Sequence, residues 1–299
     1  MKKYIGIDLG GTNCRVAVVD ENGNIGDMLI TPSYADQSSD VIVNNIINSV
    51  KQIADYSKYP GIGIGVPGPV DQKNGWMTMA SNIPALEKYP LISHLSNELG
   101  LPVFMDNDAN VAGLAEAILG AGKDYDNVVY ITHSTGIGGG IIYNKQIISG
   151  IRGYAGEVAN IVIDPNLEKI NHLNAGAIEN HASGTALVKK AQLLIDKNIT
   201  SAKELFDLYA DKNPEACKII DTMCYQMGLM LANIAHVLNP ECFVFGGGVT
   251  KSCELYFDKM IDCYKSLVHP PMADTKFVLA GLKEPGIVGA ALIPYSKGV

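Results

Sequence analysis

The run Asp106-Asn107-Asp108-Ala109-Asn110 places carboxylates and amides where a predicted strand ends and a predicted helix begins. Asp and Asn are favoured helix caps, so one interpretation is simply a capped helix start. The functional interpretation is that ligands of α/β sheets bind at the carboxyl ends of strands. A carboxylate in that place can accept the proton of a substrate hydroxyl as the hydroxyl oxygen attacks a phosphoryl group.

Two glycine-rich turns provide groups that can hold phosphates. Gly10-Gly11-Thr12 follows the apolar run 4–9, and the stretch 134–140, with Thr135 and Gly136, follows the apolar run 128–133. Glycine permits positive φ and leaves its N–H open to an anion, and threonine adds a hydroxyl donor. One such turn is also typical of a plain hairpin. Two of them, each at the start of one half of the chain, indicate a duplicated fold that closes on a polyphosphate.

Further acids and amides stand in the second half of the chain, among them Glu157, Asn160 and Glu179. Carboxylates and amides hydrogen-bond vicinal hydroxyls, which is how a site distinguishes a sugar from an apolar ligand. Isolated acids are also common on solvated surfaces, so each of these residues alone fits either role. A third glycine turn, Gly246-Gly247-Gly248, follows the predicted strand 242–245.

Several familiar motifs are absent or out of context. The stretch 63–68 matches G-x-G-x-x-G, but Pro67 and Pro69 prevent the helix that dinucleotide binding needs at that point. Nothing matches G-x-x-x-x-G-K-[ST] or G-x-S-x-G. These observations argue against the dinucleotide-binding, P-loop and α/β-hydrolase classes.

Composition narrows the class of protein further. The chain has 299 residues, of which 47% are apolar and 18% charged, as expected of a protein with a well-buried core. Its net charge is −8 and no cluster of Lys and Arg stands out, which argues against a nucleic-acid surface. A small anionic ligand fits this composition, because backbone N–H groups can hold it without lysines.

Nothing in the chain predicts export or membrane insertion. No stretch approaches the roughly 20 apolar residues of a membrane helix, and Asp8 interrupts the short apolar run near the start. The 6 cysteines form no C-x-x-C pair, which is typical of free thiols. We therefore expect a cytoplasmic protein without a membrane partner.

Helical and strand patterns alternate along both halves, which predicts an α/β protein. The expected strands and meanders are 4–32, 61–66, 103–105, 128–148, 242–245 and 276–280, and the expected helices are 42–54, 110–121, 174–196, 214–238 and a last one from about residue 287. Ser201 and Glu204 form a predicted capping box. Glycines near 112–122 suggest a boundary, so we expect domains at 1–117 and 118–286, with the last helix packing back on the first domain.

At this point the chain resembles a known family. Short motifs occur in the order seen in ROK-family sugar kinases and cover nearly the whole chain: Asp8–Asn13, Gly65–Asp71, Asp106–Asn110, Thr135–Gly140, Gly156–Glu157 and Phe245–Val249. The resemblance implies the actin-like ATPase fold, with two ribonuclease H-like domains and a cleft between them for ATP and sugar.

The resemblance also assigns roles by motif position. Asp108 would be the general base, and Asp8 would lie near Mg²⁺ through water. The residues that would contact phosphates or adenosine are Gly10, Gly11, Thr12, Thr135, Gly136, Gly246, Gly247 and Gly248. The residues that would bind sugar hydroxyls are Asn82, Asn107, Glu157 and Glu179, with Asn160 able to hydrogen-bond a hydroxyl where the family has histidine.

Three departures from the family pattern limit which family properties can be assigned to this chain. Many members have a C-x-C-G-x-x-G-C zinc loop, but the stretch 170–179 contains no cysteine, so we predict no structural zinc. Asn160 replaces a histidine that binds both that zinc and the sugar. Ser134 replaces a glycine of the second phosphate turn, where a negative φ would fit and a positive φ would cost strain.

The resulting prediction is an ATP-dependent hexose kinase, glucokinase-like, acting on the C6 hydroxyl and forming a homodimer. The alternatives are a sugar-sensing ROK regulator, a silent sugar-binding protein, or another actin-like ATPase or acyl-phosphate kinase. Regulators carry a winged-helix DNA-binding domain ahead of the first turn, and here seven residues precede Asp8. The sugar itself stays open among glucose, N-acetylmannosamine, allose, fructose and β-glucosides.

Overall fold

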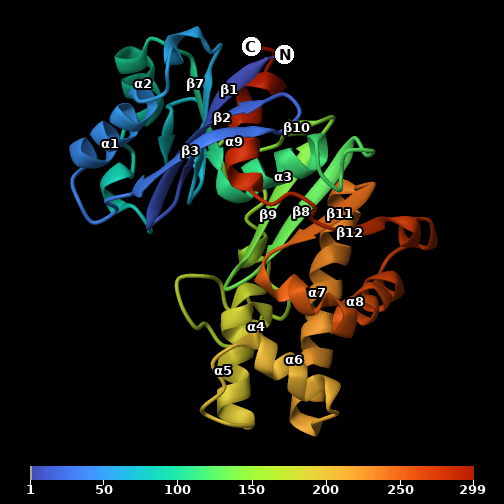
Figure 1. The fold of residues 1–299 in the computed structure, drawn as a ribbon. Coiled ribbons are helices and arrows are strands. Elements are labelled where there is room, and N and C mark those ends of the chain that lie inside the picture. Colours follow the sequence, from blue (N-terminus) through green and yellow to red (C-terminus); the bar gives the residue numbers. More distant parts are fainter. Residues whose placement is uncertain (1) are drawn as a thin grey trace. The chain divides into compact units, whose positions relative to one another are not determined.

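The computed structural model describes residues 2–299 and shows an α/β protein (Figure 1). The chain divides into two compact units. Unit 1 contains Met1–Tyr130, Gly140–Gly156 and Ala280–Val299, and unit 2 contains Ile131–Gly139 and Glu157–Leu279.

The first sheet has the strand order β3-β2-β1-β4-β7 and lies in unit 1. Its first three strands form the predicted antiparallel meander, and β4 and β7 then add in parallel to β1. The elements of this unit are β1 (Lys3–Leu9), β2 (Asn13–Asp20), β3 (Ile25–Pro32), α1 (Ser39–Lys51), β4 (Ile62–Val66), β5 (Val70–Asp71), β6 (Trp76–Met77), α2 (Leu91–Leu99), β7 (Val103–Asn107), α3 (Asp108–Ile118) and α9 (Pro285–Ser296), with 3-10 turns at Tyr56–Lys58 and Pro84–Leu86.

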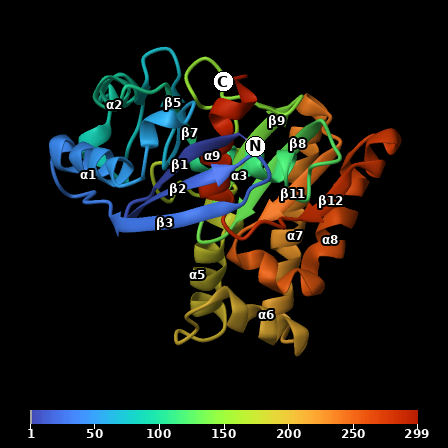
Figure 2. The same ribbon diagram turned by 45° about the horizontal axis from the view of Figure 1, so that its top comes forward.

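Helices cover both faces of this sheet, which explains why its inner strands read as nearly continuous apolar runs. On β1, Ile5 and Ile7 belong to the core shared with α1 and α2, whereas Tyr4 belongs to the core shared with α3 and α9. Figure 1 shows α1 and α2 on one side of the strands and α9 on the other, and Figure 2 shows α3 beside α9.

The last helix, α9, lies so close to the sheet that two strand positions must be glycine. A methyl group on Gly6 would come within 2.5 Å of the Ile287 carbonyl oxygen, and one on Gly63 would overlap the Ala290 carbonyl oxygen. The backbone of α9 therefore rests directly on β1 and β4, which holds the C-terminal segment on the same sheet as the first glycine turn.

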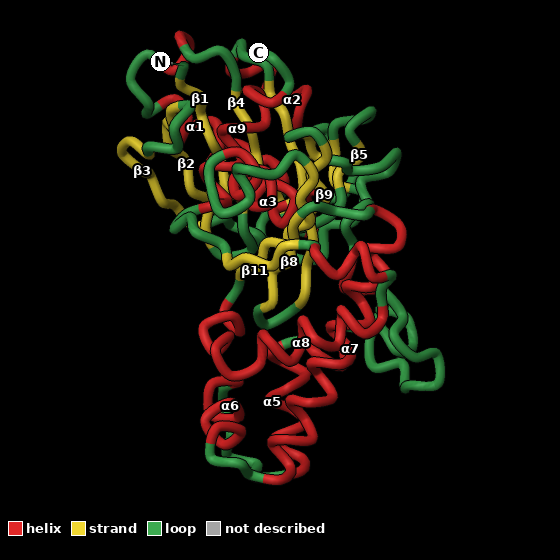
Figure 3. Tube along the Cα trace, turned by 90° about the vertical axis from the view of Figure 1, so that its right-hand side faces the viewer, coloured by secondary structure: helices red, strands yellow, loops and turns green. Residues whose placement is uncertain are grey.

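The second sheet has the strand order β10-β9-β8-β11-β12. The elements from residue 127 to residue 279 are β8 (Asn127–His133), β9 (Ile137–Tyr143), β10 (Gln146–Ile147), α4 (Glu179–Ala182), α5 (Gly184–Leu194), α6 (Ala202–Ala210), α7 (Pro214–Leu238), β11 (Cys242–Gly246), α8 (Cys253–Leu267) and β12 (Lys276–Leu279), with 3-10 turns at Val158–Asn160, Gly248–Ser252 and Pro270–Asp274. Figure 3 shows α5, α6, α7 and α8 gathered in unit 2.

Local signals explain where several helices begin. Asn213 accepts hydrogen bonds from the first turn of α7, and Ser201 caps α6 in the predicted capping box. The expected helix 174–196 is instead two helices. Ser183 ends α4 in an extended conformation and then caps α5, because its side chain accepts from the Ala186 N–H.

Within residues 2–299, no helix combines the length and the apolar character that crossing a membrane requires. The cysteines at positions 14, 217, 224, 242, 253 and 263 are all free thiols.

The close approach of α9 generates a stability prediction. Gly63→Ala should lower the free energy of unfolding by about 1–3 kcal/mol, because the added methyl group must displace the α9 backbone. Gly26→Ala on β3 is the matched control, since its methyl group would lie 3.4 Å from the nearest atom, and it should change stability by less than about 0.5 kcal/mol. Urea unfolding measures both, and equal midpoints would contradict this packing.

Candidate functional site

The first glycine turn joins β1 to β2 in unit 1. The Gly10 N–H donates to the Asn13 carbonyl oxygen at 2.9 Å, and the Thr12 carbonyl oxygen accepts from the Ser33 N–H at 2.9 Å. Gly10 and Gly11 are not among the glycines with positive φ. A methyl group on Gly11 would lie 3.6 Å from the Asn82 Cβ atom. Both positions therefore leave open space beside the backbone, and the structure brings Asn82 to that turn.

Asp8 lies near the end of β1, opposite Arg15 on β2. The Arg15 Nη1 atom is 3.5 Å from Asp8 Oδ2 and 3.3 Å from Glu284 Oε2. Burial raises the pKa of Asp8, Arg15 opposes that rise, and Glu284 adds to it. Gly286 lies against the same carboxyl group, since a methyl group there would lie 3.2 Å from it.

Asn107, the last residue of β7, is the N-cap of α3. Its Oδ1 atom accepts from the Ala109 N–H at 2.9 Å and from the Asn110 N–H at 3.4 Å. The capping interpretation of this run is therefore confirmed, and the helix begins at Asp108, two residues earlier than predicted. Because the oxygen is committed to the helix, Asn107 can offer a ligand its Nδ2 donors.

Asp108 has the electrostatics of a general base. It is exposed to solvent, yet the surrounding protein desolvates it enough to raise its pKa to about 6. The negative charge of Asp8 adds to this rise, while the hydrogen bond from the Ala109 N–H at 2.8 Å opposes it. A carboxyl group with this pKa is ionised at neutral pH and is a stronger base than an ordinary aspartate.

The second glycine turn joins β8 to β9, and its backbone tolerates the serine. The Ser134 N–H donates to the Gly136 carbonyl oxygen at 2.9 Å. Ser134 is not among the non-glycine residues with positive φ, so the conformation that would fit a serine is the one observed. The Ser134 carbonyl oxygen accepts from the Gly184 N–H at 2.8 Å, which joins this turn to the start of α5.

Glu179, the first residue of α4, reaches the second glycine turn. Its Oε2 atom accepts from the Ile137 N–H at 2.9 Å. A methyl group on Gly136 would come within 2.5 Å of the same oxygen, so glycine at this position lets the carboxylate sit where it does. The structure thus places a residue predicted to bind sugar beside a residue predicted to bind phosphate.

The third glycine turn lies against the second. Gly247 has a φ of +96°, and its backbone rests on His133, the last residue of β8. A methyl group on Gly248 would lie 3.6 Å from the Ser134 Oγ atom. Burial lowers the pKa of His133 to about 4, so this residue is neutral, and its Nε2 atom makes a 2.8 Å hydrogen bond with the Ala182 carbonyl oxygen.

A pocket of about 890 Å³ opens beside these two turns and lies wholly in unit 2. Its lining includes Thr135 and Gly248, which the sequence had suggested as nucleotide contacts. Further lining residues that sequence reasoning missed come from α5: Gly184, Thr185, Val188, Lys189 and Gln192. The available signal was the Ser183-Gly184 break inside the predicted helix.

Side-chain amides hold the segment between Asn160 and Asn180. The Asn160 Oδ1 atom accepts from the Asn174 N–H at 2.7 Å. Asn171 and Asn180 donate to each other through their side chains, both at 2.9 Å. Asn160 therefore keeps its Nδ2 donors for a ligand. Among residues 2–299, no group of three or more potential metal ligands occurs.

The candidate residues fall into two sets. Unit 1 brings together the first turn and the turn 106–110, called the catalytic turn after its predicted base. The candidate residues there are Asp8, Gly10, Gly11, Thr12, Asn82, Asn107 and Asp108. Unit 2 joins Thr135, Gly136 and Glu179 to the third turn, Gly246–Gly248. Glu157 and Asn160 also lie in unit 2, at the two ends of one short 3-10 turn.

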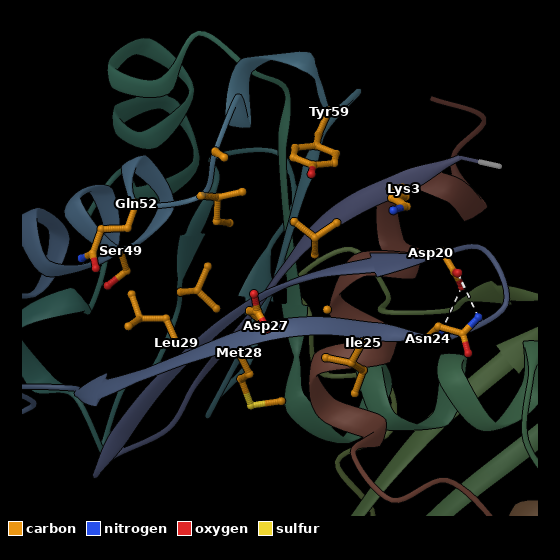
Figure 4. A pocket seen from close by; sticks show the side chains of 15 residues that line it. Lys3, Asp20, Asn24, Ile25, Asp27, Met28, Leu29, Ser49, Gln52 and Tyr59 are labelled. Atoms are coloured by element: carbon orange, nitrogen blue, oxygen red, sulfur yellow. Dashed lines mark hydrogen bonds between the residues drawn. The ribbon is translucent and has the colours of Figure 1, made fainter.

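Another hollow, of about 660 Å³, lies between the β2–β3 strands and α1 in unit 1 (Figure 4). None of the candidate residues lines it. Its Asp20 carboxylate is engaged by the turn that follows β2, since it accepts from the Asn24 side chain at 2.9 Å. This hollow is therefore separate from the candidate site.

A family model and a relative of similar length match this sequence over nearly all of the chain. The family model described as "ROK family" matches residues 4–296. A glucokinase of Thermotoga maritima is 31% identical, over 97% of this chain and 96% of its own length.

Solved structures show the same fold. A ROK hexokinase from Thermus thermophilus superposes with a TM-score of 0.88 at 29% identity, covering 99% of this chain and 98% of the other. A ROK family glucokinase from Streptomyces griseus, in complex with glucose and AMPPNP, gives a TM-score of 0.75 at 29% identity, with coverages of 97% and 98%. The fold is the actin-like ATPase fold, and this chain belongs to the ROK family.

Proposed function

We propose that this protein is a glucokinase-like, ATP-dependent kinase that phosphorylates a hexose, at its C6 hydroxyl. The observation that carries the proposal is the Asp108 carboxylate, which follows the parallel strand β7 and has a pKa raised to about 6. The similarity to proteins named glucokinase, over nearly the whole chain, supports the same reaction.

Asp108 would remove the proton of the sugar hydroxyl while the hydroxyl oxygen attacks the γ-phosphorus of ATP. A new O–P bond forms, the bond from the γ-phosphorus to the bridging oxygen breaks, and ADP leaves. Asn82, Asn107, Glu157, Asn160 and Glu179 would hydrogen-bond the other hydroxyls. Such contacts orient the sugar for in-line attack.

The glycine turns would hold the nucleotide. Thr135 and Gly248 line the pocket of unit 2, which is large enough for an adenosine group. Backbone N–H groups of Gly11 and Gly136, with the Thr12 hydroxyl, would bind phosphate oxygens. The Gly10 N–H is held by the Asn13 carbonyl oxygen, so Gly10 would contact the phosphates without donating to them. These donors are fixed before the reaction, so they stabilise charge without reorganisation.

Asp8 is a suitable partner for Mg²⁺. Its carboxylate is partly exposed, with 24% of the side chain accessible, and among residues 2–299 no group of three or more potential ligands forms a protein-only cage. Mg²⁺ is usually held by one or two carboxylates together with waters and substrate phosphates, and this donor set fits that pattern. When bound, the ion would neutralise part of the phosphate charge.

We also infer a homodimer in the cytoplasm, on the resemblance to the family. Sedimentation velocity of the purified protein tests the assembly, and a monomer at micromolar concentration would contradict it.

An ATP-coupled screen of aldoses, ketoses and N-acetylhexosamines, compared by kcat/KM, tests the proposed reaction. Sugar-dependent ADP release with a phosphorylated hexose as product supports it. Sugar binding without ADP release would instead support a silent sugar-binding protein or a regulator, and ADP release that no sugar stimulates would support another ATPase.

Replacing the proposed base tests its assignment. Asp108→Asn should lower kcat by about 10²–10⁴-fold, because the proton acceptor is lost. The dissociation constant for the sugar should change by less than about threefold, since an amide of the same shape can still hydrogen-bond. Asp36→Asn, at an exposed site of the same unit, is the matched control. A variant that kept a large share of kcat would show that another group is the base.

The pKa of Asp108 also predicts a pH profile. The pKa of Asp108 is raised from 3.8 to about 6. Its carboxyl group is therefore ionised above that pH and progressively protonated below it. The kcat/KM for sugar should therefore be level above pH 7 and fall towards acid, about tenfold per pH unit well below 6. A profile that stays level down to pH 4.5 would be inconsistent with this base.

A further inference from the structure

Asp106, two residues before the proposed base, has a buried carboxylate with a full set of hydrogen bonds. Only 4% of the residue is exposed. Oδ1 accepts from the Asn107 N–H and from Asn110 Nδ2, both at 2.8 Å. Oδ2 accepts from Ser149 Oγ at 2.7 Å and from Gln72 Nε2 at 2.9 Å. Buried carboxyl oxygens need such partners, so each of these donors contributes to keeping the Asp106 side chain in place.

The four donors come from three segments of unit 1 that lie far apart in the sequence. Asn107 and Asn110 belong to the turn that carries Asp108. Gln72 follows β5, in the hairpin that β5 forms with β6. Ser149 begins the loop 149–156. One carboxylate thus joins the catalytic turn, the β5–β6 hairpin and this loop.

Hydrogen bonds and backbone contacts hold the loop 149–156 in a compact shape against β5. Its ends are drawn together, because the Ala155 N–H donates to the Ser149 carbonyl oxygen at 3.1 Å. In its middle, the Gly153 backbone, with a φ of +77°, lies directly against the backbone of Val70 in β5. The Thr78 hydroxyl also donates to the Tyr154 hydroxyl at 3.2 Å.

The loop 149–156 leads directly into Glu157, a residue predicted to bind the sugar. Gly156, with a φ of +94°, is its last residue, and Glu157 is the next residue of the chain. The backbone that presents Glu157 therefore emerges from a loop anchored on Asp106. Movement of the loop would change the presentation of Glu157 without touching Asp108.

We propose that Asp106 is a positioning residue that sets the affinity for sugar by holding the loop 149–156 against the catalytic turn through Ser149. The inference rests on the proposed function, because it concerns how the same sugar is held. It assigns Asp106 and Ser149 no contact with the sugar.

Ser149→Ala removes the bond to the loop and leaves the other three donors to Asp106. The KM for sugar should rise about tenfold, as expected when a buried hydrogen bond is lost, while kcat and the KM for ATP stay within about threefold. Ser149→Thr keeps the hydroxyl and should restore the KM. Ser33→Ala is the matched control, because the Ser33 hydroxyl is also buried in unit 1 but has no hydrogen-bond partner there.

A double-mutant cycle adds a readout that general destabilisation would not produce. In the Asp106→Asn background, Ser149→Ala should raise the KM for sugar by less than about twofold further, because its carboxyl partner is already gone. The chain's single tryptophan, Trp76 on β6, provides a second readout. Acrylamide should quench its fluorescence more strongly in Ser149→Ala than in Ser33→Ala.

An unchanged KM for sugar in Ser149→Ala, or effects of Asp106→Asn and Ser149→Ala that simply multiply, would overturn the inference while the kinase activity itself stands. A wild-type protein that phosphorylates no sugar would overturn the proposed function first, and this inference with it. These outcomes are distinguishable because the wild-type assay comes before the variants.

Discussion

The close approach of α9 to the first sheet is the constraint on which unit 1 depends. Gly6 and Gly63 lack side chains because the α9 backbone occupies that space, and Gly289 of α9 lies equally close to Val111 of α3. The last helix of the chain is therefore fixed against the first strand. The same contact brings Glu284 and Gly286 to Asp8, so the environment of the carboxylate proposed to meet Mg²⁺ is built from both ends of the chain.

The three glycine turns look alike in sequence but use glycine for different physical reasons. Gly10 and Gly11 keep ordinary backbone angles and leave an open approach. Gly136 leaves room for the Glu179 carboxylate, and Gly247 adopts a positive φ above the backbone of His133. The catalytic turn is similarly divided, because Asn107 caps the helix while Asp108 stays available. In the catalytic turn the structural and the proposed chemical tasks thus fall on different residues.

Sequence reasoning was strongest where a feature is local. The glycine turns, the helix cap in the run 106–110, the capping box at Ser201 and the order of strands and helices all depend on neighbours in the chain. It was weakest where a bond joins distant segments. Glu179 meets Ile137 across 42 residues, and Ser149 meets Asp106 across 43, and no spacing rule predicts either. The pocket wall from α5 was missed for the same reason. The domain boundary near residue 117 and the roles of the site residues stay predictions.

The paired amides of Asn171 and Asn180 have a consequence for how the protein senses its surroundings. Neither side chain gains or loses a proton at any pH at which a protein stays folded, and the bond from Asn174 to Asn160 is equally neutral. These side-chain bonds are therefore insensitive to acidity. Any response of the site to acid is left to carboxyl groups such as Asp108, so the proposed chemistry can slow on acidification while these amide bonds stay in place.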